Sequence, residues 1–562
     1  MANIVEEKIK IFALGGLDEN GNNLYVVEVN EKIFVLDAGL KYPSEELLGV
    51  DAVIPDFTYL IENAENVQGV FLSHGHEEHI GALPQLLSVI NVPVYGTRLT
   101  MSVVEDTLSE NGMNIKKFKL YKIRETNELF FGDTKVTFFK TTHSIPDSVA
   151  ICIHTKAGVI VYTSDFSFDQ GAISRYQTNY TRISDISKEG VLCMLSESTN
   201  AVRSGHTGTG TALKHALEEV FARAEGRIIC SLYSSDLNRI QMVVDLAIQY
   251  NRKVAIIGRK MQRLVDISVK LGYLKIPKSM LMNLLFIDEK NDNNLPNLVV
   301  LATGNRYEPF NALTRMAKHQ DRLVHIENTD TVIVATPPIP GTETKAARTA
   351  DLLYRTGSKV EIINRQLLPT SHASSEDLKL MMNLLKPEYI MPVSGEYYQL
   401  IAHAKVAAQM GYNPEHIILL DNGEIVGFEQ GELVNHHETI PIDQVLVDGL
   451  GVGDIGSVVL RDRHIMSNDG IVVIIVNLNK QNKKIIAGPE IVSKGFVYGR
   501  ENEELFTALS ELVKNIIAEF TTAQYVNWQG LRQELRDKIG KLIFGKAKRR
   551  PIIIPIVEEF NI

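Results

Sequence analysis

Short apolar runs bounded by turn residues dominate the first part of the chain, and this pattern predicts strands. The run 32–36 ends at Asp37, which places a carboxylate at a strand end. A longer helical segment interrupts the strands, so we expect sheets inside and helices outside. The expected strands are 9–14, 23–29, 32–36, 92–95, 120–123, 135–140, 148–155 and 158–163, and a helix is expected near 99–111.

From about residue 208 the pattern changes to a regular alternation of helix and strand. This alternation predicts a parallel α/β module of about 150 residues. The strand 388–391 then resembles the first region again, as if the module were inserted into it. The expected helices are 212–224, 237–250, 262–271, 310–318 and 344–356, and the expected strands are 227–233, 254–257, 297–302, 331–335 and 360–363.

A last unit begins near residue 442. Its two helices are amphipathic, which makes the unit a reasonable assembly surface. The basic run from Lys546 to Arg550 is more often a solvated helix end than an RNA contact. In this unit we expect strands at 456–461, 470–478, 484–488 and 551–557 and helices at 503–519 and 530–544. The expected domain ranges along the chain are 1–207, 208–367, 368–441 and 442–562.

The composition narrows the class of protein. With 562 residues, about two to four domains are expected. The net charge of −10 argues against a protein that coats polyanions, although a local basic channel could still hold nucleic acid. Cys152, Cys193 and Cys230 each lie in an apolar run, which favours buried free thiols in a reducing compartment. The chain lacks an apolar signal segment and any run that could span a bilayer, so we expect a cytoplasmic protein without membrane contact.

A histidine-rich loop is the strongest chemical signal in the chain. Residues 73–79 read Ser-His-Gly-His-Glu-Glu-His and lie between an apolar strand and the start of a helix. Imidazole and carboxylate ligands together suit zinc or a similar divalent ion. His74 and His76 can reach one ion, and Glu78 and His79 can reach a second. The alternative, a solvated polar loop, does not account for this density of ligands.

His143 and Asp165 also stand just past apolar strands. Each alone could be an ordinary turn residue. Together with the histidine loop, their order and spacing resemble the metallo-β-lactamase superfamily. The resemblance implies that His74, His76 and His143 hold the first ion and that Asp165 bridges to a second. It also implies that Glu78 and His79 serve the second ion, and that Asp37 orients a ligand.

Three further segments resemble the β-CASP branch, whose members cut nucleic acids. Residues 195–200 contain Glu197, residues 371–373 contain His372, and residues 391–397 contain Ser394. The segments 460–464 and 487–498 are similar to those of bacterial ribonuclease J. The resemblance covers essentially the whole chain. It implies an αββα metallo-β-lactamase sandwich with an inserted β-CASP parallel α/β domain and a small α/β C-terminal domain.

The resemblance implies metal-assisted hydrolysis of RNA, with up to two zinc ions per chain or manganese in their place. His372, paired with Glu197, would protonate the leaving 3′ oxygen; the alternative is a helix N-terminal residue, since 374–377 looks like a capping region. The resemblance also implies that two segments, 233–235 and 368–372, hold a terminal 5′-monophosphate. Alternatively, Ser234 and Ser235 cap the helix 237–250. The implied substrate-binding residues are Tyr233, Ser234, Ser235, Leu368, Pro369, Thr370, Ser371 and His372.

The chain departs from the family pattern at five positions. Glu78 stands for aspartate, Ser394 for a histidine ligand of the second ion, and Leu368 for a histidine in the pocket. Ser371 replaces glycine, and Asp236 replaces asparagine. A serine hydroxyl is a poor zinc ligand, so we expect one well-held ion, a weak second site and slow hydrolysis. This pattern resembles a second, weakly active paralogue found in Gram-positive bacteria.

Two functions remain open. The first is a 5′-to-3′ exoribonuclease of low turnover, with endonuclease action as an additional mode, in rRNA processing and mRNA decay. The second is a largely non-catalytic partner that stabilises an active ribonuclease J paralogue. The implied partners are 5′-monophosphorylated RNA, a second copy of the chain and that paralogue. A thioester or lactam hydrolase on the same core is disfavoured by the inserted module and the C-terminal unit.

Overall fold

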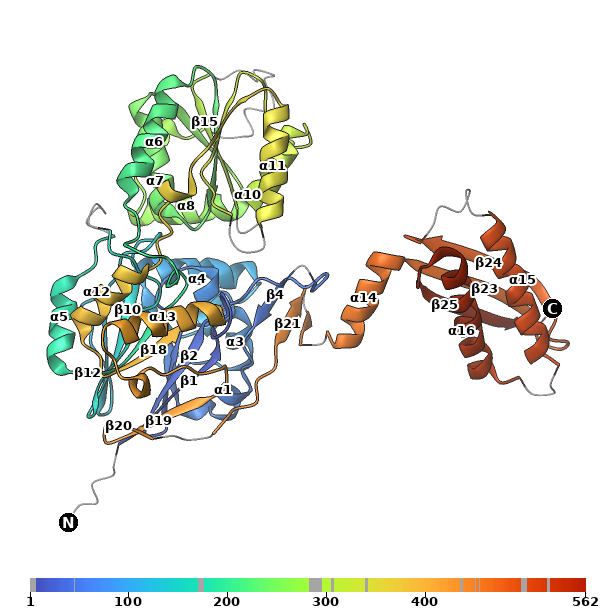
Figure 1. Cartoon of the computed structure of the whole chain (residues 1–562), viewed down its shortest axis with the longest axis horizontal. Coiled ribbons are helices and arrows are strands. Elements are labelled where there is room, and N and C mark those ends of the chain that lie inside the picture. The colour runs from blue at the N-terminus through green and yellow to red at the C-terminus, as the bar shows by residue number, and fades with distance from the viewer. Residues whose placement is uncertain are drawn as a thin grey trace, which may run out of the picture. The chain divides into compact units, whose positions relative to one another are not determined.

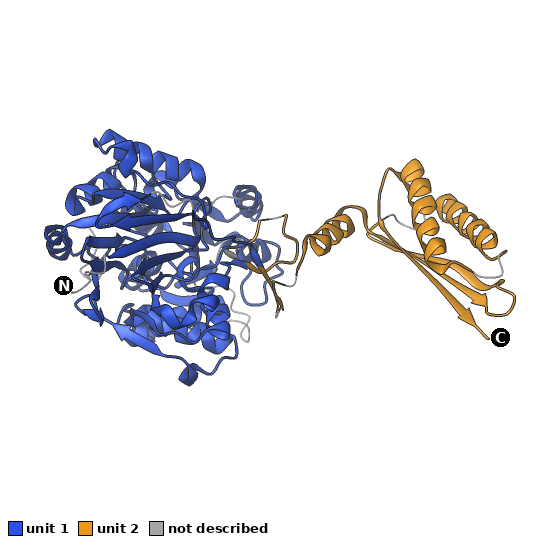
Figure 2. Ribbon diagram, turned by 90° about the horizontal axis from the view of Figure 1, so that it is seen from below, with its two compact units in different colours: residues 1–42, 53–445 blue, residues 43–52, 446–562 orange. Residues whose placement is uncertain are grey.

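The structure is a computed structural model, and it divides into two compact units, residues 1–42 with 53–445 and residues 43–52 with 446–562 (Figure 2). Among the described residues, no helix combines the length and the apolar character that crossing a bilayer requires. The structure describes residues 7–44, 46–169, 176–282, 296–304, 308–338, 342–434, 438–449, 451–453, 455–496, 503–522 and 526–561.

Two facing sheets form the centre of the first unit (Figure 1). One has eight strands in the order β20-β19-β1-β2-β3-β5-β6-β7, and the other has six in the order β18-β12-β11-β10-β9-β8. Phe34 and Phe71 of the first sheet pack with Phe138 and Tyr162 of the second in one core. The strands are β1 (Lys8–Gly15), β2 (Leu24–Val29), β3 (Lys32–Leu36), β5 (Val67–Phe71), β6 (Val94–Thr97), β7 (Leu120–Ile123), β8 (Leu129–Phe131), β9 (Thr134–Lys140), β10 (Val149–Thr155), β11 (Gly158–Tyr162), β12 (Val191–Glu197), β18 (Tyr389–Val393), β19 (Ile425–Glu429) and β20 (Glu432–Val434).

Helices cover the outer faces of both sheets, so the predicted αββα sandwich is confirmed (Figure 1). On the six-stranded sheet, Ile183 of α5 and Met381 of α12 pack against Cys152 and Met194. On the other side, α3 packs on α4, which contacts β6. The helices of this part are α1 (Thr58–Glu62), α2 (Glu77–Ile80), α3 (Leu83–Val89), α4 (Arg98–Glu110), α5 (Tyr180–Glu189), α12 (Ser375–Leu385) and α13 (Tyr397–Gln409).

A third sheet, with all five strands parallel, forms the inserted module, as the sequence pattern predicts. Its order is β14-β15-β13-β16-β17, with α6, α7 and α8 packed on one face and α10 and α11 on the other. The chain then returns to the first core, where β18 pairs with β12. The elements are α6 (Gly210–Arg223), β13 (Ile228–Tyr233), α7 (Leu237–Gln249), β14 (Lys253–Ile257), α8 (Arg259–Leu271), β15 (Leu298–Gly304), α10 (Glu308–Ala317), β16 (Thr331–Val334), α11 (Glu343–Arg355) and β17 (Lys359–Ile362).

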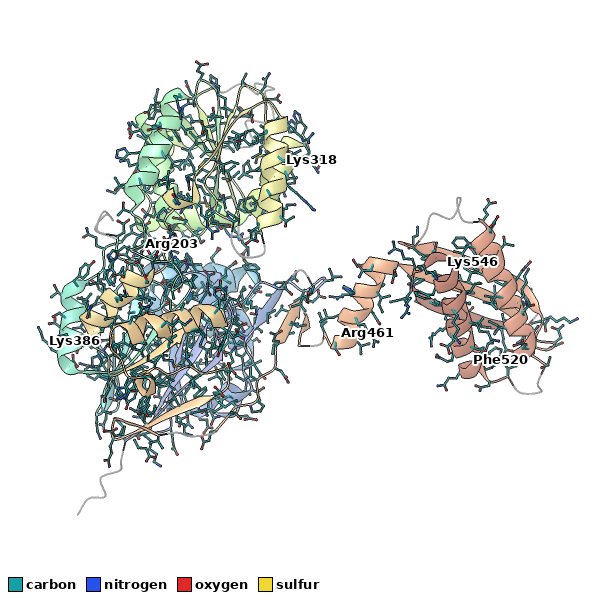
Figure 3. The ribbon with its side chains drawn as sticks, viewed as in Figure 1. Arg203, Lys318, Lys386, Arg461, Phe520 and Lys546 are labelled. Atoms are coloured by element: carbon teal, nitrogen blue, oxygen red, sulfur yellow. The ribbon has the colours of Figure 1, made fainter. Side chains whose placement is uncertain are left out.

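The second unit contains a three-stranded sheet in the order β24-β23-β25. Alternate residues of β23, such as Val472 and Ile474, are buried against two helices, α15 and α16. Figure 3 shows Lys546 near the end of α16. The elements are β21 (Val445–Asp448), β22 (Gly451–Val452), α14 (Ser457–Asp469), β23 (Ile471–Asn479), β24 (Ile485–Lys494), α15 (Glu503–Phe520), α16 (Trp528–Ala547) and β25 (Ile552–Phe560).

One predicted strand of this unit is wrong. Residues 456–461, expected as a strand, are the N-cap and first turn of the helix α14. Val458 and Val459 suggested a strand because β-branched residues favour sheets. Both side chains are exposed, so they do not pack against a neighbouring strand that would stabilise the extended conformation. Residues 497 and 498 of the C-terminal motif lie outside the described residues.

Candidate metal centre

The candidate ligands stand where strands of both sheets end. The loop 73–79 follows β5 of the eight-stranded sheet and leads into α2, with His76 at the N-cap. His143 follows β9 and Asp165 follows β11, both in the six-stranded sheet. Residues past a strand end leave the alternation of inward and outward side chains, so side chains from separate strands can converge there. The four candidate ligands, His74, His76, His143 and Asp165, are all buried.

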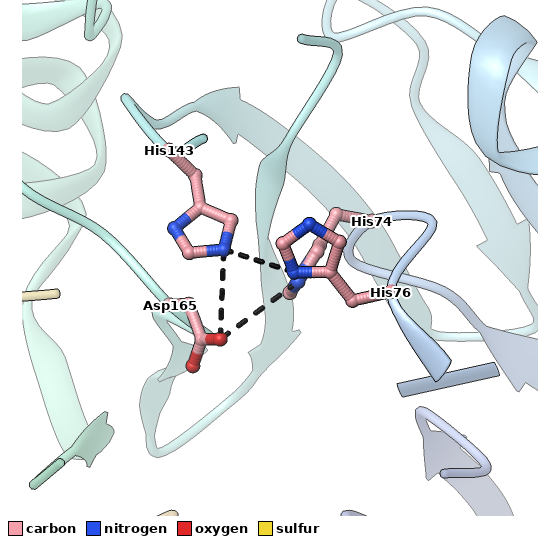
Figure 4. Close-up of side chains that lie close together, drawn as sticks. All are labelled: His74, His76, His143 and Asp165. Carbon is pink, nitrogen blue, oxygen red and sulfur yellow. Dashed lines mark hydrogen bonds and ion pairs between the residues drawn. The ribbon is translucent and has the colours of Figure 1, made fainter. Parts of the chain in front are cut away.

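Four of these side chains meet around one point (Figure 4). Nε2 of His143 lies 3.2 Å from Nδ1 of His76 and 3.7 Å from Oδ2 of Asp165. Nε2 of His74 lies 3.8 Å from the same Asp165 oxygen. Ligand atoms of a tetrahedral zinc ion are about 3.4 Å apart, from metal–ligand distances of about 2.0–2.1 Å. The observed separations therefore fit a zinc ion.

The electrostatics of the four residues also fit a cation. Burial, reinforced by the neighbouring histidines, holds the pKa of His74 and that of His143 well below the usual value, so both rings are neutral and can offer a lone pair. Burial alone would raise the pKa of Asp165, but the charges of His79 and His372 outweigh it and hold that pKa well below normal. Nε2 of His74 is buried, and no described residue forms a hydrogen bond with it. A buried polar atom without a partner is costly, and a metal ion would satisfy it.

His79 lies beside this group and bridges two carboxylates. Its Nδ1 is 2.7 Å from Oδ2 of Asp37, and its Nε2 is 3.2 Å from Oδ2 of Asp165. Asp37 also accepts hydrogen bonds from the backbone and hydroxyl of Ser73 and from the hydroxyl of Tyr162, each at 2.8 Å. The fully buried Asp37 thus holds the ring of His79.

The structure does not bring Glu78 into the same group. Its side chain is 42% exposed, and Oε1 lies 3.5 Å from Nδ1 of His76. The groups of side chains that could hold an ion, within the described part of the chain, do not include Glu78. A glutamate extends one methylene further than aspartate, and here its carboxylate points partly to solvent.

Ser394 stands where the family pattern has a histidine, and its hydroxyl is bound by neutral groups. Oγ lies 3.1 Å from the hydroxyl of Tyr25 and donates to Oδ1 of Asn23 at 3.1 Å. The Tyr25 hydroxyl donates to the same Asn23 oxygen at 2.8 Å. Nδ2 of Asn23 lies 3.4 Å from Nε2 of His79. This closed polar network adds no anionic or imidazole ligand beside His79.

His372 and Glu197 form a pair next to Asp165. Nδ1 of His372 lies 2.7 Å from Oε2 of Glu197 and 3.8 Å from Oδ2 of Asp165. The other Glu197 oxygen accepts from the backbone N–H of Phe166 at 2.7 Å and of Ala373 at 3.1 Å. Burial lowers the pKa of His372, but Glu197 and Asp165 outweigh it and raise that pKa to about 9. The ring is therefore charged at neutral pH.

The two loops expected to hold a phosphate are joined to the candidate ligands. The carbonyl oxygen of Ser371 accepts a hydrogen bond from Nδ1 of His143 at 2.8 Å. The carbonyl oxygen of Ser235 lies 3.3 Å from Nε2 of His76. In both rings the nitrogen that faces away from the ligand group is thus held by a backbone carbonyl of these loops. Such contacts fix the orientation of a ligand ring.

These loops differ in part from the sequence expectations. The side chain of Leu368, one of the expected substrate-binding residues, is 2% exposed and packs in a hydrophobic core. Ser234 and Ser235 do not cap α7: the N-cap is Asp236, whose carboxylate accepts from the backbone N–H of Arg239 at 2.9 Å. The same carboxylate pairs with the Arg239 guanidinium at 3.1 Å, which offsets the repulsion of phosphate expected from Asp236. His372 does precede a helix cap, in which Asp377 accepts from the backbone N–H of Ser374.

The sequence reasoning missed Asn23, Tyr25 and Arg239. Asn23 and Tyr25 flank the start of β2, where a buried asparagine is the signal that could have found them. Arg239 is 4% exposed, and its guanidinium donates to the carbonyl oxygen of Pro369 at 3.0 Å, which ties α7 to the second loop. An arginine on the apolar side of a helix pattern is rare enough to mark such a tie.

Three histidines and an aspartate at strand ends of an αββα sandwich, together with an inserted parallel α/β module, define a metallohydrolase of the metallo-β-lactamase fold. Four family models match successive parts of the chain. They are "Metallo-beta-lactamase superfamily" at residues 17–196, "Ribonuclease J, beta-CASP domain" at 225–353, "Zn-dependent metallo-hydrolase RNA specificity domain" at 366–418 and "Ribonuclease J C-terminal domain" at 458–560.

Curated relatives match over nearly the whole length. The chain is 42% identical to ribonuclease J2 of Bacillus subtilis, over 98% of this chain and 99% of that protein. It is 41% identical to ribonuclease J 2 of Staphylococcus epidermidis, over 98% of each. The chain therefore belongs to the ribonuclease J family. A solved Enterococcus faecalis protein of unknown function shares the fold, with a TM-score of 0.52 and 14% identity over 75% of this chain and all of that one.

Proposed function

We propose that this member of the ribonuclease J family is a slow, metal-dependent ribonuclease that trims 5′-monophosphorylated RNA from the 5′ end, with endonuclease action as a second mode. Its place is RNA processing and decay in the cytoplasm, in keeping with three buried free cysteines. The observation that carries the proposal is the convergence of His74, His76, His143 and Asp165 beside the charged ring of His372.

The proposed metal ligands are Nε2 of His74, Nδ1 of His76, Nε2 of His143 and Oδ2 of Asp165. Zinc suits this donor set best, and manganese is the alternative. When bound, such an ion polarises a scissile phosphate and makes water a stronger nucleophile. The histidine rings are held for this task by backbone carbonyls, and Asp165 is ionised at any neutral pH.

His372 is the proposed proton donor. Glu197 accepts from Nδ1 of the ring, which leaves Nε2 to carry the second proton of the charged imidazole. The His372 side chain is 24% exposed, so a substrate can reach it. The proton would pass from Nε2 to the leaving 3′ oxygen of the scissile bond, and Glu197 would stabilise the charged ring before the transfer. Backbone N–H groups and hydroxyls at 233–235 and 369–371 would hold the 5′-phosphate.

Low activity follows from the surroundings of His79. Ser394, Tyr25 and Asn23 satisfy one another there, and Glu78 points partly to solvent. A second ion would find His79 and Asp165 but neither the usual aspartate nor the usual histidine. The proposal is one tightly held ion and a weak second site.

A second role, as a partner subunit for an active paralogue or a second copy of this chain, is supported by the second unit. In β23, Val473 and Ile475 point away from the helices. Val473 lies between Ile554 of β25 and Val492 of β24, and Ile475 pairs with Ile556 of β25. Ile554 and Val492 are 39% and 38% exposed. An apolar sheet face of this kind favours association.

The deciding experiment is a time course on 5′-monophosphorylated RNA, with and without added manganese, with the variant His76→Ala as control against contaminating nuclease. Release of 5′ mononucleotides that disappears in the variant supports the enzyme. Equal degradation by both proteins would overturn it. The partner role is tested by co-purification with the active paralogue, and a strictly monomeric protein in its presence would exclude that role.

A further inference from the structure

The end of α16 carries a concentration of positive charge that the candidate metal centre does not use. From Lys538 to Val557 the chain has six lysine and arginine residues and no carboxylate, although its net charge is −10. Four of these cations follow one another closely and are exposed: Lys546, Lys548, Arg549 and Arg550. We call these four residues, with Phe544, the basic patch of the second unit.

Most of this charge is not neutralised by the protein. Arg549 donates to the carbonyl oxygen of Asn468 at 3.0 Å and lies 3.5 Å from the carboxylate of Asp469. Among the described residues, the other three cations of the patch form no ion pair with a carboxylate. A helix C-terminus attracts cations over its last turn, which explains Lys546. It does not explain Arg550, which lies beyond the C-cap at Lys548.

The cations are arranged on an aromatic ring. Phe544 is 39% exposed, and the guanidinium carbon of Arg550 lies 4.5 Å from its ring centroid. Nζ of Lys548 lies 5.3 Å from the same centroid. A guanidinium on a ring face keeps its N–H donors at the edge, where they can bind phosphate oxygens in pairs. Its outer face remains available for a nucleobase to stack on.

Gly545 keeps the surface beside this ring low. A glycine within a helix makes the helix less stable than an alanine would, so a glycine at this position needs an explanation. Packing supplies none, because a Cβ atom at this position would meet nothing within 4 Å. The missing side chain instead leaves room for a ligand backbone to approach between Phe544 and Lys546.

We propose that the basic patch is a second binding site for single-stranded RNA, separate from the metal centre, in which the cations hold successive phosphates and Arg550 stacks on a base. Single-stranded nucleic acid is bound by this combination of cations along a backbone track and flat stacking groups. A chain with a net negative charge repels RNA at long range, so a local patch is needed to retain it. The identity of RNA as the ligand rests on the proposed function.

The test is fluorescence anisotropy of the full chain with a labelled 5′-hydroxyl oligouridylate of about 12 nucleotides, in EDTA. The variant is Lys546→Gln/Lys548→Gln/Arg550→Gln. The matched control, Lys480→Gln/Lys484→Gln/Lys514→Gln, removes the same charge from exposed positions of the same unit. We expect the patch variant to bind on the order of tenfold more weakly at 0.1 M salt, with the slope of log affinity against log salt reduced by about two. The control should bind as wild type.

A second measurement uses the unaltered protein. Photo-crosslinking of the same oligonucleotide carrying 4-thiouridine should label the peptide that contains Phe544. No label there, or equal loss of binding in the control variant, would overturn the proposal, as would preferential binding of the patch to anionic phospholipid vesicles. Neither measurement needs hydrolysis or a 5′-phosphate. A patch that binds in a protein without nuclease activity would therefore refute the proposed function and leave this inference standing.

Discussion

The carbonyl oxygen of Ser371 lies 2.8 Å from Nδ1 of His143 and accepts its hydrogen bond, although the two residues are 228 positions apart. The bond turns Nε2 of His143 toward His76 and Asp165. Residue 371 has φ of +61°, a left-handed conformation that costs a serine free energy. The orientation of a candidate ligand thus depends on a strained backbone in the loop proposed to hold a phosphate.

Substitution of Ser371 tests this dependence. Ser371→Gly should raise the free energy of unfolding by about 1 kcal/mol, because glycine adopts the left-handed conformation freely. Ser371→Val should lower it and weaken zinc binding by about tenfold or more, since the carbonyl shifts. Thermal unfolding and zinc competition with a chromophoric chelator measure both effects. As a control, Ser109→Gly in the helix α4 should destabilise by about 0.5 kcal/mol. Unchanged zinc affinity in Ser371→Val would show that the carbonyl does not orient His143.

Removal of the charge on Glu197 should slow the reaction without releasing the metal. In Glu197→Gln the ring of His372 loses the carboxylate that keeps it protonated, so kcat should fall by about 10²- to 10⁴-fold. In the wild type, the rate supported by this proton should decline as the pH rises through about 9. Zinc content measured by elemental analysis should stay the same, and the exposed His206→Gln should behave as wild type. A zinc-free Glu197→Gln protein would instead make Glu197 part of the metal site.

Purified protein should retain one zinc ion per chain after dialysis. The four buried candidate ligand atoms meet around one point, and Nε2 of His74 has no hydrogen-bond partner among the residues that the structure describes. The variant Asp165→Asn should lose this ion, because it removes the only anionic ligand of the group. Elemental analysis of both proteins gives the ratio directly. Two ions retained by the wild type would refute the argument from Ser394.

The layers of the fold could be predicted from periodicity, and the candidate ligands from residue types at strand ends together with the resemblance to the metallo-β-lactamase superfamily. Hydrogen bonds between segments that are distant in the sequence could not be predicted from it. Nothing local to Ser394 shows that its hydroxyl meets Tyr25 and Asn23, or that Asp236 caps its helix and pairs with Arg239. The strand expected at 456–461 failed because valine propensity was not supported by any neighbouring strand.

Restoring the usual ligands should create a second ion site. Ser394→His with Glu78→Asp supplies the imidazole and the shorter carboxylate of the family pattern, so metal content should rise from about one to about two ions per chain, with faster hydrolysis of 5′-monophosphorylated RNA. Ser394→Ala with Glu78→Asp is the control, because it also opens the network with Tyr25 but supplies no ligand. If a second ion binds but hydrolysis is not faster, the rate is limited by the loops 233–235 and 369–371 that are proposed to hold the 5′-phosphate.

His403 should make the first unit sensitive to acid. The ring is fully buried, its Nδ1 lies 3.1 Å from Oγ of Ser198, and burial lowers its pKa to about 3. Below pH about 6.5 the unfolded chain binds a proton here that the folded chain does not, so stability present at neutral pH is lost as the pH falls toward 3. Between pH 7.0 and 5.5 the loss should be about 1 kcal/mol, from the linkage relation. Thermal unfolding of His403→Gln should show a smaller drop over this range than the wild type. The exposed His215→Gln should drop as much as the wild type, and an equal drop in all three proteins would mean that another group takes up the proton.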